Sequence, residues 1–142
     1  MRALLRSLMF PAVIALGVIG CSDDDDPMGP GGTPPPDISG TYSLVSLTQG
    51  GTPCPNPVCT GSFTATQTTN DGSTATGTID FNVTTPSGNL ADAGTYTLDS
   101  QGNWTQDTSQ QALGTATLVG STLTVTVTQP PVAASTSVWQ RQ

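Results

Sequence analysis

The chain has 142 residues, and its few charges are strongly unbalanced, with ten aspartates, three arginines and a net charge of −7. It contains no histidine, lysine or glutamate. An acidic surface repels phosphate backbones, so we expect no nucleic-acid binding. Without those residue types the chain cannot form a Ser–His–Asp triad or a Cys–His pair. Asp80, Asp99 and Asp107 could supply a carboxylate pair, but solvated surface charges explain them better. We therefore expect that the protein is not an enzyme and needs no cofactor.

Residues 1–20 have the pattern of a cleaved signal peptide. Arg2 and Arg6 precede an apolar run from Leu8 to Ile19, and the small residue Gly20 stands at its end. The run is shorter than the ~20 apolar residues that a membrane-spanning helix needs. Pro11 would also disrupt such a helix. The sequence therefore predicts export of the protein.

The end of this leader, Val18-Ile19-Gly20-Cys21, resembles the lipobox of bacterial lipoproteins. The resemblance implies that Cys21 becomes the first mature residue and carries acyl chains such as palmitate. The alternative is an ordinary signal peptide that happens to end in Gly-Cys. The chain has three cysteines, and lipidation of Cys21 leaves Cys54 and Cys59 as a pair in an oxidising compartment. Because the mature chain keeps only one cation, Arg141, the lipid itself would be the membrane anchor.

Residues 21–36 are predicted to form a flexible tether that starts at the lipidated cysteine. Four aspartates, Asp23 to Asp26, run into Pro- and Gly-rich sequence, and such segments stay solvated and extended. We expect no metal site there, because the aspartates lack the spaced ligand pattern and the glycine turn of calcium loops. In lipoproteins of bacteria with two membranes, aspartate directly after the cysteine favours the inner membrane. Ser22 occupies this position, so the expected location is the outer membrane, on its periplasmic or surface face.

Residues 37–142 are predicted to form one all-β domain. They include 24 threonines, which favour strands, and no segment has helical spacing. Two of the runs alternate clearly between apolar and polar residues. In the first, Ile79, Phe81 and Val83 face inward. In the second, Leu123, Val125 and Val127 share one face. Short turns imply antiparallel neighbours. Eight strands are expected, at 40–47, 61–69, 77–84, 94–99, 104–108, 114–119, 122–128 and 135–141.

Eight such strands can close into an antiparallel up-and-down barrel, which removes exposed sheet edges. The runs GTYSLVSL, GTYTLD, GSTLTVTV and VWQRQ resemble the small lipocalin-like (calycin-type) domains of bacterial lipoproteins. In lipocalins, an arginine of the last strand packs over the tryptophan of a Gly-x-Trp motif in the first strand. Here Gly40-Thr41-Tyr42 and Arg141 match this pair, with tyrosine in place of tryptophan. The resemblance implies that Tyr42 and Arg141 close one barrel end; a frayed terminal arginine is the alternative.

The predicted core is small for a barrel with a ligand. Leucine, isoleucine, valine and phenylalanine make up 19 of the 106 residues from 37 to 142. An eight-stranded barrel is just wide enough for side chains to fill, so we expect at most a narrow or shallow pocket. The candidate ligand contacts are Tyr42, Phe63, Tyr96 and Trp104.

Cys54 and Cys59 lie in the longest predicted loop, residues 48–60. Two thiolates without further histidine or cysteine partners cannot complete a zinc site. The spacing is not Cys-x-x-Cys, and no base is present to activate a thiolate. The sequence therefore predicts a structural disulfide in a loop that could make contacts with other molecules.

The functional expectation is a membrane-anchored, non-enzymatic domain that binds a small apolar ligand or an extracytoplasmic protein. This expectation rests on the fold resemblance. Two alternatives remain open. The domain could inhibit a protease or lysozyme through the disulfide-clamped 48–60 loop, or it could be a structural or adhesive module of the envelope.

Overall fold

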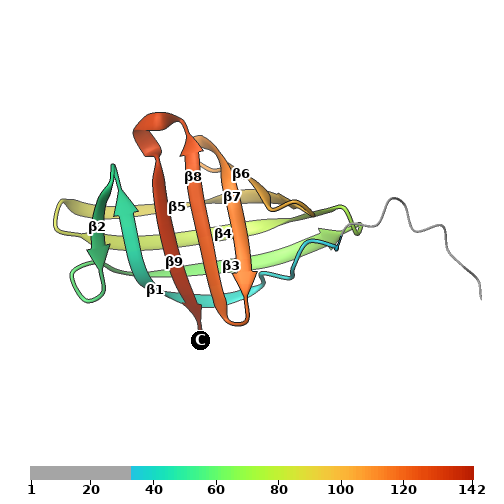
Figure 1. Ribbon diagram of the computed structural model, residues 1–142, viewed down its shortest axis with the longest axis horizontal. Coiled ribbons are helices and arrows are strands. Elements are labelled where there is room, and N and C mark those ends of the chain that lie inside the picture. Colours follow the sequence, from blue (N-terminus) through green and yellow to red (C-terminus); the bar gives the residue numbers. More distant parts are fainter. Residues whose placement is uncertain (1–32) are drawn as a thin grey trace, which may run out of the picture. The chain divides into compact units, whose positions relative to one another are not determined.

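The computed structural model describes residues 33–142, so the predicted signal peptide, Cys21 and most of the predicted tether lie outside the described residues. In the described part the predicted all-β fold is confirmed (Figure 1). No helix there is both long enough and apolar enough to span a membrane. The elements are β1 (Gly40–Gln49), β2 (Thr52–Pro55), β3 (Thr60–Asn70), β4 (Thr74–Thr85), β5 (Gly88–Asp99), β6 (Asn103–Asp107), β7 (Gln111–Val119), β8 (Thr122–Gln129), the single 3-10 turn η1 (Pro131–Ala133) and β9 (Ser135–Arg141).

The strands close into the predicted eight-stranded antiparallel barrel. From β3 onward each strand pairs with the next one in the chain, β1 pairs with β3, and β9 returns to pair with β1. This last pairing runs from Tyr42↔Arg141 to Gln49↔Ser135. In Figure 1, β8 and β9 run across β3, β4 and β5, so two walls of the barrel face each other across the interior.

The segment Thr52–Pro55 corrects the prediction of one long loop at 48–60. It folds back as β2 and pairs with the second half of β1, from Ser46↔Pro55 to Gln49↔Thr52. The turn between them uses Gly50 and Gly51, both with positive φ (56° and 80°), which glycine adopts without strain. The prolines of this segment concealed the strand, because proline is tolerated in sheets only at edges, and β2 is an edge strand outside the closed ring.

A bulge changes which side chains of β1 face the interior. The pairing with β9 shifts between Leu44 and Ser46, so Val45 is an extra residue without a partner, and it is exposed. Because one extra residue reverses the alternation, both Leu44 and Leu47 are buried. Strict alternation from Leu44 would have turned Leu47 outward.

Strand β5 also begins earlier than the sequence predicts. It starts at Gly88, six residues before the expected strand at 94–99, and pairs with β4 along its whole length, from Thr85↔Gly88 to Thr74↔Asp99. Glycine, asparagine and aspartate in SGNLADA are typical of turns, which is why this stretch was expected to be a loop. Pairing with a regular neighbouring strand overrides that local preference.

The barrel has two different ends, which we name by the turns that they carry. The closed end has the turns at 71–73, 100–102 and 120–121, and both ends of the described chain lie there. The open end has the turns at 50–51, 86–87, 108–110 and 130–134. At the open end, the backbone N–H of Gly50 donates to the carbonyl of Ala134 (3.4 Å).

Many of the largest fully buried side chains lie in the closed half of the interior. Burying one such apolar side chain contributes ~1.5–3 kcal/mol. The members are Ile38, Tyr42, Tyr96, Leu98, Trp104 and Leu123.

Glycine is required where the strands bend and approach one another closely. A Cβ atom on Gly114 would lie 1.8 Å from the carbonyl oxygen of Thr126, beside the bulge that shifts the β7–β8 register. A Cβ atom on Gly77 would lie 2.2 Å from the carbonyl oxygen of Thr66 and 2.7 Å from the Tyr96 ring. These two glycines let the walls curve enough to close the barrel.

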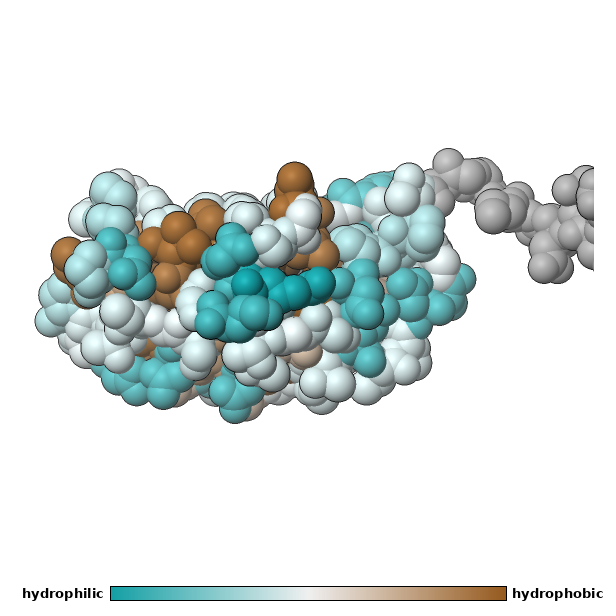
Figure 2. Space-filling model, turned by 90° about the horizontal axis from the view of Figure 1, so that it is seen from below, coloured by the Kyte–Doolittle hydropathy of each residue, from teal (hydrophilic) through white to brown (hydrophobic). Residues whose placement is uncertain are grey.

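The outer surface is mostly polar and carries scattered apolar side chains. Figure 2 shows hydrophobic groups between pale and hydrophilic ones on the face seen from below. The large exposed hydrophobic residues of the described part are Val45, Val58, Leu90, Leu113, Val119 and Val132.

Candidate functional site

The segment before β1 seals the closed end. Ile38 is fully buried, and Pro35 is buried as well. The Asn70 side chain donates to the Pro35 carbonyl (3.1 Å), and the backbone N–H of Gln67 donates to the Ser39 hydroxyl (2.9 Å). Pro35 lies in the stretch predicted to be tether, and it packs against the barrel through this contact with Asn70.

Arg141 contacts Tyr42 chiefly at the hydroxyl group of the tyrosine. The guanidinium carbon lies 5.3 Å from the ring centroid, whereas Nη2 and Nε donate to the hydroxyl oxygen at 2.7 and 3.1 Å. That hydroxyl donates in turn to the Ile38 carbonyl (2.8 Å), and Arg141 Nη2 also donates to the Asp37 carbonyl (3.0 Å). Arg141 thus links the last strand, the first strand and the sealing segment. The Tyr42 hydroxyl, which a tryptophan at this position would lack, supplies the acceptor.

Tyr96 and Trp104 stack inside the closed half. Their ring centroids lie 4.9 Å apart at 11°, and both side chains are almost fully buried. Within the described residues, the Tyr96 hydroxyl and Trp104 Nε1 have no hydrogen-bond partner. Burial raises the pKa of Tyr96 from 10.0 to about 12, with smaller contributions from Asp37 and Tyr42. These rings belong to the packed core.

A pocket of about 400 Å³ occupies the open half of the barrel. Small side chains along its wall, such as Ala112, Ser135 and Ser137, leave this space unfilled. The lining includes five apolar side chains, which we call its apolar floor: Phe63, Phe81, Val83, Val125 and Trp139. Its rim carries neutral polar side chains from the open-end turns and nearby strands, including Asn89, Gln106, Ser109, Gln110 and Gln111.

Of the four candidate ligand contacts, Phe63 is the one that lines this pocket; Tyr42, Tyr96 and Trp104 lie in the closed half. The Phe63 ring packs between the two halves. Its centroid lies 5.8 Å from the centroid of the Tyr42 ring and 5.4 Å from that of the Trp139 ring. Trp139 also lines the pocket and was not among the four candidate contacts, although its place in the last predicted strand was a usable signal.

Asp92 places a carboxylate at the pocket. It is on β5 directly opposite Phe81, and it accepts hydrogen bonds from the backbone N–H of Ser109 (3.2 Å) and from the Ser109 hydroxyl. The hydroxyl bond is the main reason why the pKa of this carboxyl lies below 3.8. Asp92 is therefore ionised at neutral pH.

The predicted disulfide between Cys54 and Cys59 is present, with a Cα–Cα distance of 5.5 Å. It joins the end of β2 to the residue before β3. Cys54 pairs with Leu47, whose side chain lines the pocket, although neither cysteine does. Cys59 is fully buried in the core and Cys54 packs against that core, so the bridge ties β2 to the start of β3 next to the pocket wall.

The first prediction concerns pH. Backbone, hydroxyl and amide donors hold the pKa values of Asp37, Asp71, Asp92 and Asp99 below 3.8 in the folded state. The stability that these carboxylates contribute is complete above pH 3.8. It is lost as the pH falls through their lower pKa values in the folded state. Tyr96 has the opposite sign, because its raised pKa stabilises the fold below pH 10.0 and this contribution is lost as the pH rises towards about 12.

The thermal midpoint should therefore be nearly constant from about pH 5 to 9 and fall on both sides. Tyr96→Phe should reduce the alkaline fall and leave the acid fall unchanged. Calorimetry across the pH range checks this. A thermal midpoint that does not change between pH 2 and 4 would contradict the predicted contribution of the four aspartates.

A second prediction concerns Arg141. Arg141→Met removes the hydrogen bonds to Tyr42 and to the Asp37 carbonyl, so the free energy of unfolding should fall by about 1–3 kcal/mol. Arg141→Lys keeps the charge without the planar fork and should lose an intermediate amount. Urea unfolding followed by circular dichroism measures both. If both variants unfold like the wild type, Arg141 is a frayed terminal residue in solution.

Comparisons of the chain with known protein families, with curated proteins and with solved structures found no match. The described residues contain no group of three or more histidine, cysteine, aspartate or glutamate side chains that could hold a metal ion. The barrel itself is compatible with a lipocalin-like fold, and the pocket is the feature from which a function can be argued.

Proposed function

We propose that the protein is a lipid-anchored lipoprotein of the bacterial outer membrane whose barrel binds a small apolar ligand without catalysis. The observation that carries the binding function is the open-end pocket with its apolar floor. Its volume, about 400 Å³, lies at the lower end of the ~300–1,000 Å³ typical of ligand pockets.

The distribution of core side chains supports this reading of the pocket. The bulky residues are concentrated at the closed end, where the sealing segment completes their packing. The open half instead combines aromatic and branched floor residues with small wall residues. A barrel that only needed stability would gain by filling this space, because cavities in a core are destabilising. A ligand with an apolar body would fill it instead.

The chain connectivity is consistent with an N-terminal anchor. Residues 33–39 join the barrel at its closed end, whereas the pocket opens at the other end. A lipid on Cys21 would thus be connected to the end of the barrel that lacks the pocket. Support for the lipid itself comes from the lipobox resemblance in the sequence.

Tryptophan fluorescence tests the binding function. Trp139 lines the pocket and Trp104 does not. In the Trp104→Phe variant, titration with linear alcohols from hexanol to decanol should shift the Trp139 emission saturably. The matched Trp139→Phe variant should show little change, because Trp104 is enclosed by the packed half. If neither variant responds to any alcohol, the pocket does not take apolar ligands.

The anchor is tested separately in cells of a bacterium with two membranes. Wild-type protein should incorporate labelled palmitate and fractionate with the outer membrane, and Cys21→Ala should lose both the label and the membrane association. Ser22→Asp is the matched control, which should keep the label and move towards the inner membrane. Label retained in Cys21→Ala would refute lipidation at this residue.

A further inference from the structure

A carboxylate stands directly beside the apolar floor of the pocket. The register of the strands puts Phe63 opposite Phe81 and Phe81 opposite Asp92, and all three residues line the pocket. Asp92 lies four residues before Tyr96 on the inward-facing row of β5, close to the open end. A ligand whose apolar body rests on the phenylalanines would bring its head group to this carboxylate.

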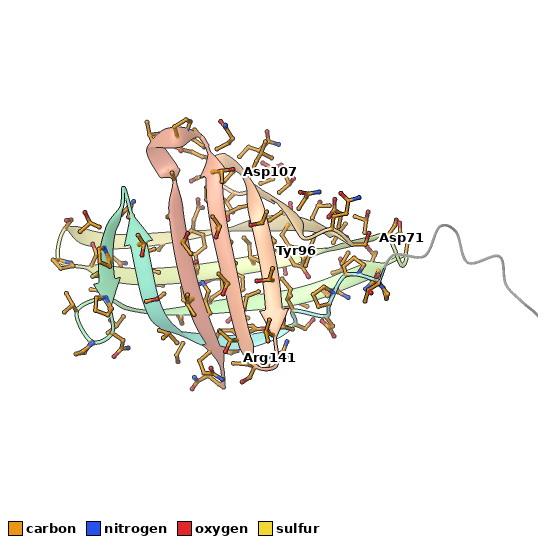
Figure 3. All side chains as sticks on the ribbon, in the orientation of Figure 1. Asp71, Tyr96, Asp107 and Arg141 are labelled. Atoms are coloured by element: carbon orange, nitrogen blue, oxygen red, sulfur yellow. A yellow bond between two sulfur atoms is a disulfide. The ribbon has the colours of Figure 1, made fainter. Side chains whose placement is uncertain are left out.

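The charge of Asp92 is fixed in place and is not neutralised by a nearby cation. Ser109 holds the carboxylate through its backbone N–H and its hydroxyl. Arg141, the one cation among residues 33–142, is bound at the closed end to Tyr42 and the Asp37 carbonyl. Figure 3 shows Arg141 and Asp107 towards opposite ends of the barrel. Asp107 adds a second, exposed carboxylate at the open end.

The remaining polar groups of the pocket are neutral. Amides such as Gln49 and Gln106 and hydroxyls such as Ser135 can donate or accept hydrogen bonds, but they add no positive charge. A carboxylate head group would therefore meet Asp92 without a compensating cation. An ammonium group would find an ionised carboxylate, whose oxygens accept otherwise from neutral donors, the backbone N–H of Ala93 and the N–H and hydroxyl of Ser109.

We propose that the pocket is selective for cationic amphiphiles, that is, amines on an apolar body, and that it discriminates against fatty-acid carboxylates. This selectivity rests on the proposed ligand-binding function and names its ligand class. It follows from the position of Asp92 on the pocket wall and from the confinement of the described cation to the other end.

Three probes of equal chain length separate the head-group effect from the apolar body: octylamine, octanol and octanoate. Titrated at neutral pH and low salt into the Trp104→Phe protein, octylamine should bind about 3- to 10-fold more tightly than octanol, and octanoate more weakly than octanol. Raising the salt concentration should narrow these differences, because the Debye length falls to ~3 Å at 1 M.

Asp92→Asn supplies the decisive variant, because asparagine can still accept the hydrogen bonds from Ser109. It should lower the octylamine affinity to the octanol affinity measured on the same variant, so that the preference for the amine over the alcohol is lost. The matched control is Asp80→Asn, which removes the same charge from an exposed position on β4 that does not line the pocket. This control should leave the ranking of the three probes unchanged.

The outcomes distinguish the two proposals. If none of the probes binds, the ligand-binding function itself fails. If all three bind equally, or octanoate binds most tightly, ligand binding stands and the cationic selectivity is overturned. Equal loss of octylamine affinity in Asp92→Asn and Asp80→Asn would also overturn it, because the effect would then be one of net charge. If Asp92→Asn does not fold, the ranking and salt dependence of the Trp104→Phe protein still decide.

Discussion

The pairing of β1 with β9 is the constraint on which the rest of the structure depends. Without it the eight consecutive strands would form an open sheet with two unpaired edges and one apolar face in water. With it, the residues that alternate inward on every strand share one interior. The Tyr42–Arg141 register also places the guanidinium group beside the hydroxyl that it binds. The same pair of residues therefore takes part both in closing the sheet and in sealing one end of the barrel.

That interior is divided unequally, and the division separates stability from binding. Tyr96 and Trp104 stack in the closed half, even though each keeps a buried polar atom without a partner among the described residues. Such atoms destabilise the fold, and the large apolar area of these rings offsets that loss. In the open half small side chains line part of the wall, and β2 with its disulfide borders that wall beside Leu47. A rigid wall around unfilled apolar space is what a ligand pocket requires.

The sequence predicted the class of fold and most strands, because alternation and turn residues are local signals. It could not predict where along the barrel axis an inward residue lies, since alternation identifies a face and not a depth. Tyr96 was therefore predicted to contact a ligand and Phe81 only to face inward, although Tyr96 packs the closed end and Phe81 lines the pocket. The bulge at Val45 and the strand pairing of SGNLADA depend on neighbouring strands. Leu47 and Asp92 could thus not be assigned to the pocket beforehand.

The placement of charge follows from the same division. A chain with one described cation can neutralise carboxylates at one place only, and Arg141 is held at the closed end by bonds to Tyr42 and to the sealing segment. The carboxylate of Asp92 is held by Ser109, a neutral partner, so its charge remains available to a ligand. Because Arg141 is bound at the closed end, the open end keeps a negative charge that no described cation neutralises. Among the described residues, Asp92 and Arg141 share no hydrogen-bond partner, so head-group selectivity at the pocket can change without weakening the closure of the barrel.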